Sequence, residues 1–181
     1  MDKRTEIRLA GEGGQGMILA GIILAEAAAI YDGKQATQTQ SYGPEARGGA
    51  SRSEVVISDD EIDHPEVLEP NIVIALSQEA YKKFAKSVHP DGWLIVDEDR
   101  VQTEPDSRAI KIPVVRLARE TTGRGITANT VALGVLVGLT KAVSRRAIEQ
   151  AVAARAPKGT EEMNQKALQA GFAAAEQVVI K

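Results

Sequence analysis

The chain has 181 residues, of which 43% are hydrophobic and 26% charged, a size and composition that favour one globular domain with a core of Ala, Val, Ile and Leu. Its net charge of −3 provides no cationic surplus for binding nucleic acid. Because it has no cysteine, disulfides, cysteine-bound iron–sulfur clusters and thiol nucleophiles are excluded. No apolar run reaches the roughly 20 residues of a membrane helix, so we expect a cytoplasmic protein that does not bind membranes.

Short β-rich runs alternate with helical stretches along most of the chain, which predicts an α/β fold. We expect a single domain over residues 1–181, with a mostly parallel open sheet, a Rossmann-like start, helices on both faces and a helical C-terminal third. In chain order the expected elements are strand 7–10, helix 17–30, strands 35–40, 53–58 and 71–76, helix 78–88, and strands 93–96 and 110–117. Three helices, 128–139, 144–154 and 160–179, complete the chain.

Local signals refine some of these elements. Pro113 lies inside the run 110–117, and a proline there indicates an edge strand or a strand position without a ladder partner. Ser144 and Thr160 precede the last two helices and are expected N-caps. His64 and His89 are far apart in the sequence and each lies beside a proline, so no metal site is expected.

The loop between the first strand and the first helix reads Gly11-Glu12-Gly13-Gly14-Gln15-Gly16. It satisfies the G-x-G-x-x-G pattern of dinucleotide sites, and its backbone N–H groups can face an anion at the helix start. Two features oppose NAD or FAD: the second strand ends without the acidic residue that binds ribose, and Glu12 would repel a pyrophosphate.

Two interpretations of the glycine loop stay open. Either its backbone contacts a phosphate, or the glycines only permit a tight turn and close packing of helix on strand. If Gly13 forms this turn with a positive φ, we expect Gly13→Val to disrupt it.

A second loop, Tyr42-Gly43-Pro44-Glu45-Ala46-Arg47-Gly48-Gly49, combines flexible glycines with an aromatic and an ionic pair. Arg47 either binds a carboxylate or phosphate with both arms of its guanidinium or pairs with Glu45. Tyr42 and Arg47 suit an interface with another subunit. Asn129, at the start of an expected helix, either caps that helix or lines the crevice beyond the strand ends.

At these two loops the chain resembles the gamma subunit of 2-oxoacid:ferredoxin oxidoreductases. The matching motifs are the glycine loop, residues 38–49, Asn129 and Leu133-Gly134; Asn164, Ala167 and Gly171 are similar to the family's closing pattern. The resemblance runs from about residue 6 to residue 171. The second loop is most similar to the 2-oxoglutarate branch, followed by pyruvate and branched-chain oxoacid enzymes.

This resemblance implies a non-catalytic subunit of a complex that oxidatively decarboxylates a 2-oxoacid, reduces ferredoxin and forms an acyl-CoA. It implies thiamine diphosphate with Mg and iron–sulfur clusters on alpha, beta and delta-type partner subunits, no cofactor or metal bound by this chain alone, and coenzyme A as co-substrate. The residues then expected to bind coenzyme A phosphates or another subunit are Gly11, Gly13, Gly14, Gln15, Gly16, Tyr42, Gly43, Pro44, Glu45, Arg47, Gly48, Gly49 and Asn129.

Two other functions remain open on the sequence. One is a free-standing nucleotide-dependent oxidoreductase that uses the glycine loop. The other is a module that binds coenzyme A or another phosphate ligand outside any enzyme complex.

Overall fold

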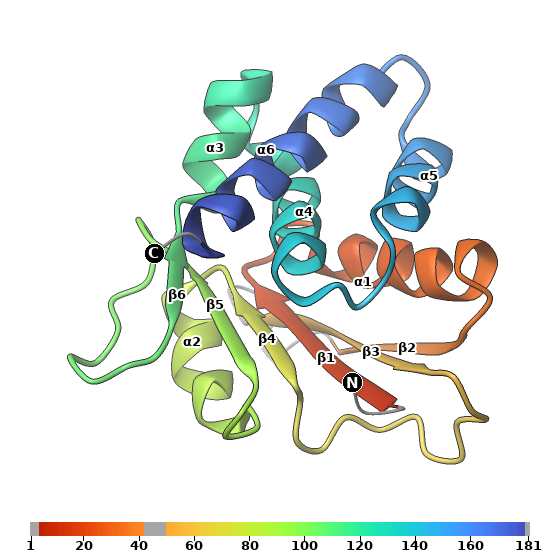
Figure 1. Ribbon diagram of the computed structural model, residues 1–181. Coiled ribbons are helices and arrows are strands. Elements are labelled where there is room, and N and C mark those ends of the chain that lie inside the picture. The colour runs from red at the N-terminus through yellow and green to blue at the C-terminus, as the bar shows by residue number, and fades with distance from the viewer. Residues whose placement is uncertain (1–3, 42–49, 180–181) are drawn as a thin grey trace.

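The computed structural model describes residues 4–41 and 50–179, and these form a mixed sheet with helices on both faces (Figure 1). The strand order is β2-β3-β1-β4-β5-β6. β1, β4, β5 and β6 pair in parallel, whereas β3 is antiparallel to both β1 and β2. The α/β fold with a mostly parallel sheet is therefore confirmed. The strands are β1 Arg4–Gly11, β2 Gln35–Ser41, β3 Ser51–Ser58, β4 Ile72–Ala75, β5 Trp93–Asp97 and β6 Ile110–Ile112.

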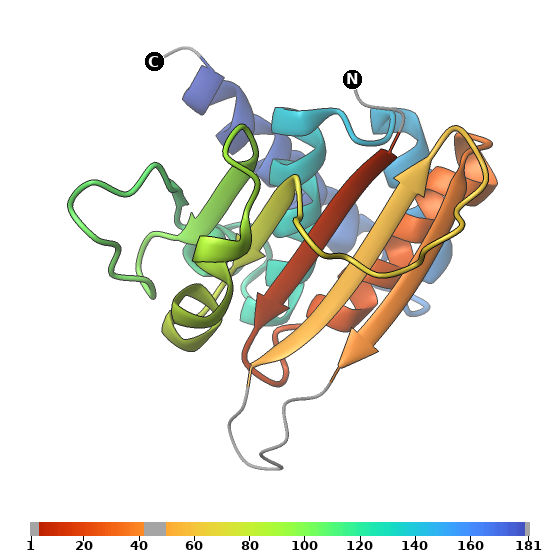
Figure 2. The ribbon, with the colours of Figure 1, turned by 90° about the horizontal axis from the view of Figure 1, so that it is seen from below.

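The two faces of the sheet are covered unequally. Most of the helices lie on the upper face in Figure 1, and α2 lies on the lower face, where a long loop crosses β1 and β3 (Figure 2). The helices are α1 Met17–Glu26 with a π-helical extension Ala27–Tyr31, α2 Gln78–Phe84, α3 Val114–Thr122, α4 Ala128–Thr140, α5 Arg145–Arg155 and α6 Glu161–Val179. Within the described residues, no helix is both long enough and apolar enough to cross a membrane.

Side chains of β1 point alternately to the two faces of the sheet and so contribute to both layers of the core. Ile7 and Leu9 belong to the upper cluster with α1, α4 and α6, whereas Ala10 belongs to the lower cluster with α2. Successive strand residues point to opposite faces, so one strand supplies both layers. α4 is buried along almost its whole length because it lies under α6 in the middle of the upper layer (Figure 1).

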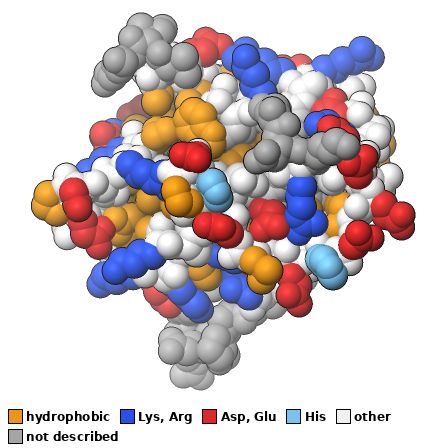
Figure 3. Space-filling view, turned by 60° about the horizontal axis from the view of Figure 1, so that its bottom comes forward, with side chains coloured by type: hydrophobic (Ala, Val, Ile, Leu, Met, Phe, Trp, Pro, Cys, Tyr) orange, Lys and Arg blue, Asp and Glu red, His pale blue; other side chains and the backbone are white. Residues whose placement is uncertain are grey.

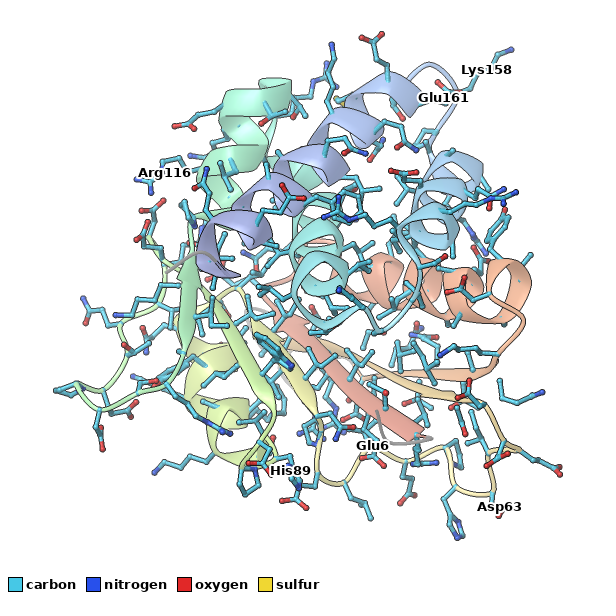
Figure 4. All side chains as sticks on the ribbon, viewed as in Figure 1. Glu6, Asp63, His89, Arg116, Lys158 and Glu161 are labelled. Atoms are coloured by element: carbon cyan, nitrogen blue, oxygen red, sulfur yellow. The ribbon has the colours of Figure 1, made fainter. Side chains whose placement is uncertain are left out.

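Charged side chains of β1 hold the loop of residues 59–71 against the lower face. Arg4 donates to the carbonyls of His64 and Glu66, and Arg8 donates to the carbonyl of Val67 at 3.0 Å. Glu6 accepts from the backbone N–H groups of Leu68 and Glu69; Figure 4 labels Glu6 at this side of the sheet and Asp63 on the loop. These bonds satisfy backbone groups of a largely exposed loop that has no regular secondary structure of its own.

The expected strand 110–117 is wrong beyond Ile112, because α3 begins at Val114. Pro113 occupies the N-cap position with φ −77°, a value that suits the entry to a helix. The buried carboxylate of Asp97, at the end of β5, accepts from the N–H of Val115 at 2.9 Å. This long-range cap satisfies an otherwise unpaired first-turn N–H, and no local sequence signal could have indicated it.

Other helix boundaries agree closely with the sequence. Ser144 caps α5 as expected, since its hydroxyl accepts from the N–H of Ala147 at 3.0 Å. Thr160 does precede α6, but its hydroxyl donates to the carbonyl of Pro157 at 2.7 Å. The expected helix 78–88 is shorter, because α2 ends at Phe84 and continues only as a 3₁₀ turn, Ala85–Ser87.

Candidate functional site

A cavity of about 600 Å³ opens beside the glycine loop, beyond the carboxyl end of β1. Its walls come from four regions that are far apart in the sequence: the glycine loop with α1, the start of β3, the start of α4 with the turn before it, and the start of α6 with the segment before it. The loop and α1 contribute Gly13, Gly14, Gly16, Met17, Ile18, Leu19 and Ile22. The other regions contribute Ser51, Arg124, Ile126, Thr127, Asn129, Pro157, Thr160, Met163 and Asn164.

The tight turn of the glycine loop rests on Gly14 and Gly16, with φ values of 88° and 73°. Gly13 does not have a positive φ, and a Cβ added there would meet no atom within 4 Å. The expectation that Gly13 forms the turn is therefore wrong. At Gly16 an added Cβ would lie 2.8 Å from Nδ2 of Asn129. Glycine at this position thus allows the starts of α1 and α4 to approach each other.

Gln15 fastens the loop to the sheet. Its Oε1 accepts from the N–H of Glu12 at 2.6 Å, and its Nε2 donates to the carbonyl of Leu76, just after β4, at 3.2 Å. A Cβ on Gly11 would collide with this Oε1. Neither Gly11 nor Gln15 lines the cavity. Both residues therefore influence the site only by holding the loop in its conformation.

The carboxylate of Glu12 faces away from the cavity. Its side chain is 56% exposed and forms an ion pair with Arg100, which follows β5, at 3.6 Å. Glu12 is not among the residues that line the cavity. The repulsion that the sequence predicts between Glu12 and a phosphate therefore does not arise on the cavity side of the loop.

Three helix N-termini supply a positive potential to the cavity, because the first turns of α1, α4 and α6 all line it. The N-terminus of a helix carries the equivalent of roughly half a positive charge, and its first N–H groups have no partner within the helix. α1 has no side-chain cap, so its first N–H groups are available to a ligand. Arg124 adds the one formal charge among the described lining residues.

Asn129 lines the cavity, but it lies inside the first turn of α4, whose N-cap residue is Thr127 and which has no side-chain cap. It is 6% exposed, and its Oδ1 accepts from the first-turn N–H of Thr130 at 2.9 Å. Its side chain also lies against Gly16 and lines the cavity. No hydrogen bond from its Nδ2 is recorded among the described residues, so this amide group is available on the cavity side.

A small polar network joins the starts of α4 and α6 at the cavity. The hydroxyl of Thr130 donates to Oδ1 of Asn164 at 3.1 Å, and Nδ2 of Asn164 donates to the carbonyl of Thr160 at 3.0 Å. Sequence analysis found Asn164 only through the family resemblance and missed the contribution of Thr130. The crossing of the two helices brings these residues together, and a one-dimensional pattern does not encode that crossing.

The lining residues that the structure describes include no Asp, Glu, His, Lys, Tyr or Cys. The described part of the cavity lining therefore lacks the paired acid and base of general acid–base catalysis. Its apolar walls and positive rim instead suit the binding of an anionic group attached to an aliphatic chain.

Tyr42, Gly43, Pro44, Glu45, Arg47, Gly48 and Gly49 lie outside the described residues. Ser51, which follows them, lines the cavity, and its hydroxyl donates to the carbonyl of Gly11 at 3.2 Å.

Within residues 4–41 and 50–179, no cluster of three or more His, Asp or Glu residues could hold a metal ion. The two histidines, pale blue in Figure 3, stand apart on a face where acidic and basic side chains alternate. The hydrogen bond from the Tyr81 hydroxyl lowers the pKa of the Glu104 carboxyl, but this pair lies at the α2 side of the sheet.

The sheet order is also unfavourable for a dinucleotide site. In a Rossmann fold the second strand lies beside the first, and its end supplies the ribose-binding acid. Here β3 separates β2 from β1. An acid at the end of β2 would therefore be too far from the glycine loop to complete such a site.

The family of this fold follows from comparison with known proteins. The family model described as "Pyruvate ferredoxin/flavodoxin oxidoreductase" matches residues 6–174. The chain belongs to this family. It is 52% identical to the 2-oxoglutarate synthase subunit KorC of Methanocaldococcus jannaschii over 97% of this chain and 96% of that protein.

Solved structures of the family have the same fold. A keto/oxoacid ferredoxin oxidoreductase gamma subunit from Geobacter sulfurreducens is 48% identical, with a TM-score of 0.88, over 96% of this chain and 97% of that chain. A 2-oxoglutarate:ferredoxin oxidoreductase from Magnetococcus marinus, solved with 2-oxoglutarate, coenzyme A and succinyl-CoA, is 25% identical with a TM-score of 0.85. That match covers 98% of this chain but 32% of the Magnetococcus chain.

Proposed function

We propose that the chain is a non-catalytic, gamma-type subunit of a cytoplasmic 2-oxoacid:ferredoxin oxidoreductase, with 2-oxoglutarate as the oxoacid. The observation that carries this proposal is the near full-length similarity to a 2-oxoglutarate synthase subunit. Thiamine diphosphate with Mg and the iron–sulfur clusters belong to alpha, beta and delta-type partners, which pass electrons to ferredoxin. The absence of cysteine from this chain supports that division of labour.

The contribution of this subunit is to bind the phosphate groups of coenzyme A beside the glycine loop. Three helix N-termini, Arg124 and the free amide of Asn129 favour an anion there. The apolar walls, which include Met17, Ile22 and Met163, suit the aliphatic part of the same ligand.

Reconstitution tests the assignment to a complex. Purified alone, the chain is expected to show no oxoacid-dependent reduction of ferredoxin. Combined with its partner subunits, it is expected to support this activity with coenzyme A, and 2-oxoglutarate is expected to be used in preference to pyruvate or branched-chain oxoacids. Turnover of an oxoacid by the isolated chain would contradict the proposal, and saturable binding of NAD or FAD would favour a free-standing oxidoreductase.

Asn129→Asp tests the coenzyme A site. Aspartate keeps the oxygen that accepts from Thr130 but replaces the free amide with negative charge. Repulsion of a phosphate bound beside this side chain is expected to raise the KM for coenzyme A at least about tenfold in the complex. Glu12→Gln is the matched control, because the Glu12 carboxylate faces Arg100, and it is expected to leave that KM unchanged. Equal KM values for both variants would contradict the proposal that coenzyme A binds in this cavity.

A further inference from the structure

The two edge strands of the sheet differ in how they are protected against pairing with a further strand. β6 is three residues long, carries Lys111 at its centre and is followed by Pro113. Short length, lysine and proline are features by which edge strands avoid edge-to-edge pairing. β2 has seven residues, and its sequence Gln-Ala-Thr-Gln-Thr-Gln-Ser contains no charged residue and no proline. The β2 edge therefore lacks all three protections.

β2 forms one border of the sheet (Figure 2). It pairs with β3 on one side, and within residues 4–41 and 50–179 no strand pairs with its other side. An edge of this kind presents backbone donors and acceptors to an incoming strand. Residues 36–40 thus offer a polar and uncharged template on which a further strand can form.

One side chain of this edge has a buried polar atom without a partner. Ala36 packs against the upper core cluster, so alternation along the strand directs Thr37 and Thr39 to the lower face of the sheet. Oγ1 of Thr37 is buried and has no hydrogen-bond partner in the described structure. A buried hydroxyl without a partner is unfavourable, and folded proteins contain few of them. A strand beside β2 that places a hydroxyl opposite Thr37 would supply the missing partner.

β2 is complementary to a second copy of itself in an antiparallel arrangement. When a two-fold axis perpendicular to the sheet relates the two strands, residues that lie opposite each other share one face of the sheet. With Gln38 on the axis, the two copies of Gln38 lie opposite each other, and Thr37 lies opposite Thr39 of the second copy. Opposed threonines form hydrogen-bonded pairs that stabilise antiparallel sheets. No like charges meet along residues 36–40.

The same operation is unfavourable at the other edge of the sheet. Pairing of β6 with a second β6 about its central residue would place Lys111 directly opposite Lys111, and opposed like charges destabilise a sheet. Self-pairing is therefore compatible with the sequence of β2 and not with that of β6.

The upper layer of helices leaves room for the second copy. α1 packs mainly over β3 rather than over β2. Adjacent strands are about 4.8 Å apart, so three strand spacings, or roughly 14 Å, would separate the two copies of β3 and the α1 helices above them. Helices in contact are about 8–10 Å apart, so the two α1 helices would not collide.

We propose that residues 36–40 of β2 pair antiparallel with the same residues of a second copy of this chain, which joins two six-stranded sheets into one continuous sheet. A strand of another sequence could also pair with this edge. The second copy is favoured because β2 itself carries the hydroxyl that Thr37 lacks, in an uncharged register. No residue of β2 is among the described residues that line the cavity, so this interface is separate from the coenzyme A site.

Disulfide trapping tests the pairing and its register. The chain has no cysteine, so Gln38→Cys introduces its only thiol. Opposed residues of an antiparallel pair have Cα atoms about 4.5–5.5 Å apart, which is within the range for a disulfide. Oxidation of Gln38→Cys is therefore expected to give a covalent dimer on electrophoresis without reductant. Gln40→Cys is the matched control on the same strand and face, and it is expected to stay monomeric because its two copies would be at least roughly 13 Å apart.

Sedimentation equilibrium of the isolated chain tests the pairing without covalent trapping. Thr39 is exposed, and Thr39→Lys gives the β2 edge the kind of charge that protects β6. This variant is expected to raise the dissociation constant of the homodimer at least about tenfold. Thr121→Lys, the same exchange at an exposed position of α3, is expected to leave the dissociation constant unchanged. Thermal melting verifies that each variant, including Gln38→Cys, keeps its fold, because the Gln38 amide donates to the Ser53 hydroxyl.

Three outcomes would overturn the proposal. One is an unmodified chain that stays monomeric at every concentration and a Gln38→Cys variant that forms no covalent dimer. Equal trapping of Gln38→Cys and Gln40→Cys would refute the register. Loss of binding to the partner subunits by Thr39→Lys, while the unmodified chain alone is monomeric, would identify a strand of another subunit as the occupant. None of these outcomes contradicts the proposed function, which reconstitution of the complex tests separately.

Discussion

Replacing Gly134 with alanine should force apart the two helices that form the back of the cavity. Gly134 on α4 faces Gly171 on α6, and α4 and α6 make the most extensive helix–helix contact in the described structure. A Cβ at position 134 would collide with the carbonyl oxygen of Leu168 and lie 2.9 Å from Cα of Gly171. The obstructing atoms are backbone, so no side-chain rotation can relieve the collision.

The expected loss of stability follows from two opposing effects. Overpacking a core costs about 1–3 kcal/mol, and a rigid backbone neighbour places this site near the upper end. Alanine in the middle of a helix gains about 1 kcal/mol over glycine. The net effect is a loss of about 2 kcal/mol, which corresponds to a fall of about 4–8 °C in the melting temperature of a domain of this size.

Thermal unfolding of the isolated chain measures this effect, with Gly13→Ala as the control. A Cβ at Gly13 meets no atom within 4 Å and its φ is not positive, so that variant is expected to melt within about 2 °C of the unmodified chain. In the complex, Gly134→Ala is also expected to raise the KM for coenzyme A, because α4 and α6 carry Asn129 and Asn164 at the cavity. An unchanged melting temperature for Gly134→Ala would refute the close backbone packing on which this reasoning depends.

Three further substitutions test other parts of the structure. Arg8→Ala is expected to destabilise the fold by about 3 kcal/mol in denaturant unfolding, because it leaves the largely buried carboxylate of Glu54, 2.7 Å from Arg8, with only the longer ion pair to Arg52 at 4.0 Å. A loss below about 1 kcal/mol would mean that the Arg8–Glu54 pair contributes little. Gln15→Ala removes both hydrogen bonds that fasten the glycine loop and is expected to cost about 1–2 kcal/mol in the same assay, so an unchanged midpoint would contradict that role. Tyr81→Phe should make the loss of stability towards acid pH less steep, because the Tyr81 hydroxyl lowers the folded-state pKa of Glu104 from its ordinary value of 4.5. The stability that this shift contributes is present above pH 4.5 and is lost as the pH falls through the lowered pKa. Identical melting temperatures of the variant and the unmodified chain at every pH from 3 to 7 would argue against this linkage.

Local patterns in the sequence determined the elements that form the entrance to the site. The apolar run of β1, the glycine loop and the apolar stretch of α1 follow from periodicity and turn chemistry within a few residues. The cap of α5 by Ser144 is equally local, because the hydroxyl and the N–H that it satisfies are three residues apart. Short sequence motifs, each spanning a few residues, also indicated the family, and the family match over residues 6–174 confirmed it.

Only the tertiary structure decided how distant segments meet. The start of α3 depends on the Asp97 carboxylate, 18 residues before the N–H of Val115 that it caps, so β-branched residues that favour a strand in isolation fold as a helix. The sequence identified Gly134 and Gly171 as motif residues, but only the structure shows why glycine is needed there: the backbones of two crossing helices are in contact at these positions. The cavity itself exists because α1, α4 and α6 begin at one place. Local propensities act over a few residues, whereas packing and burial of polar groups are settled between segments that approach only in the folded chain.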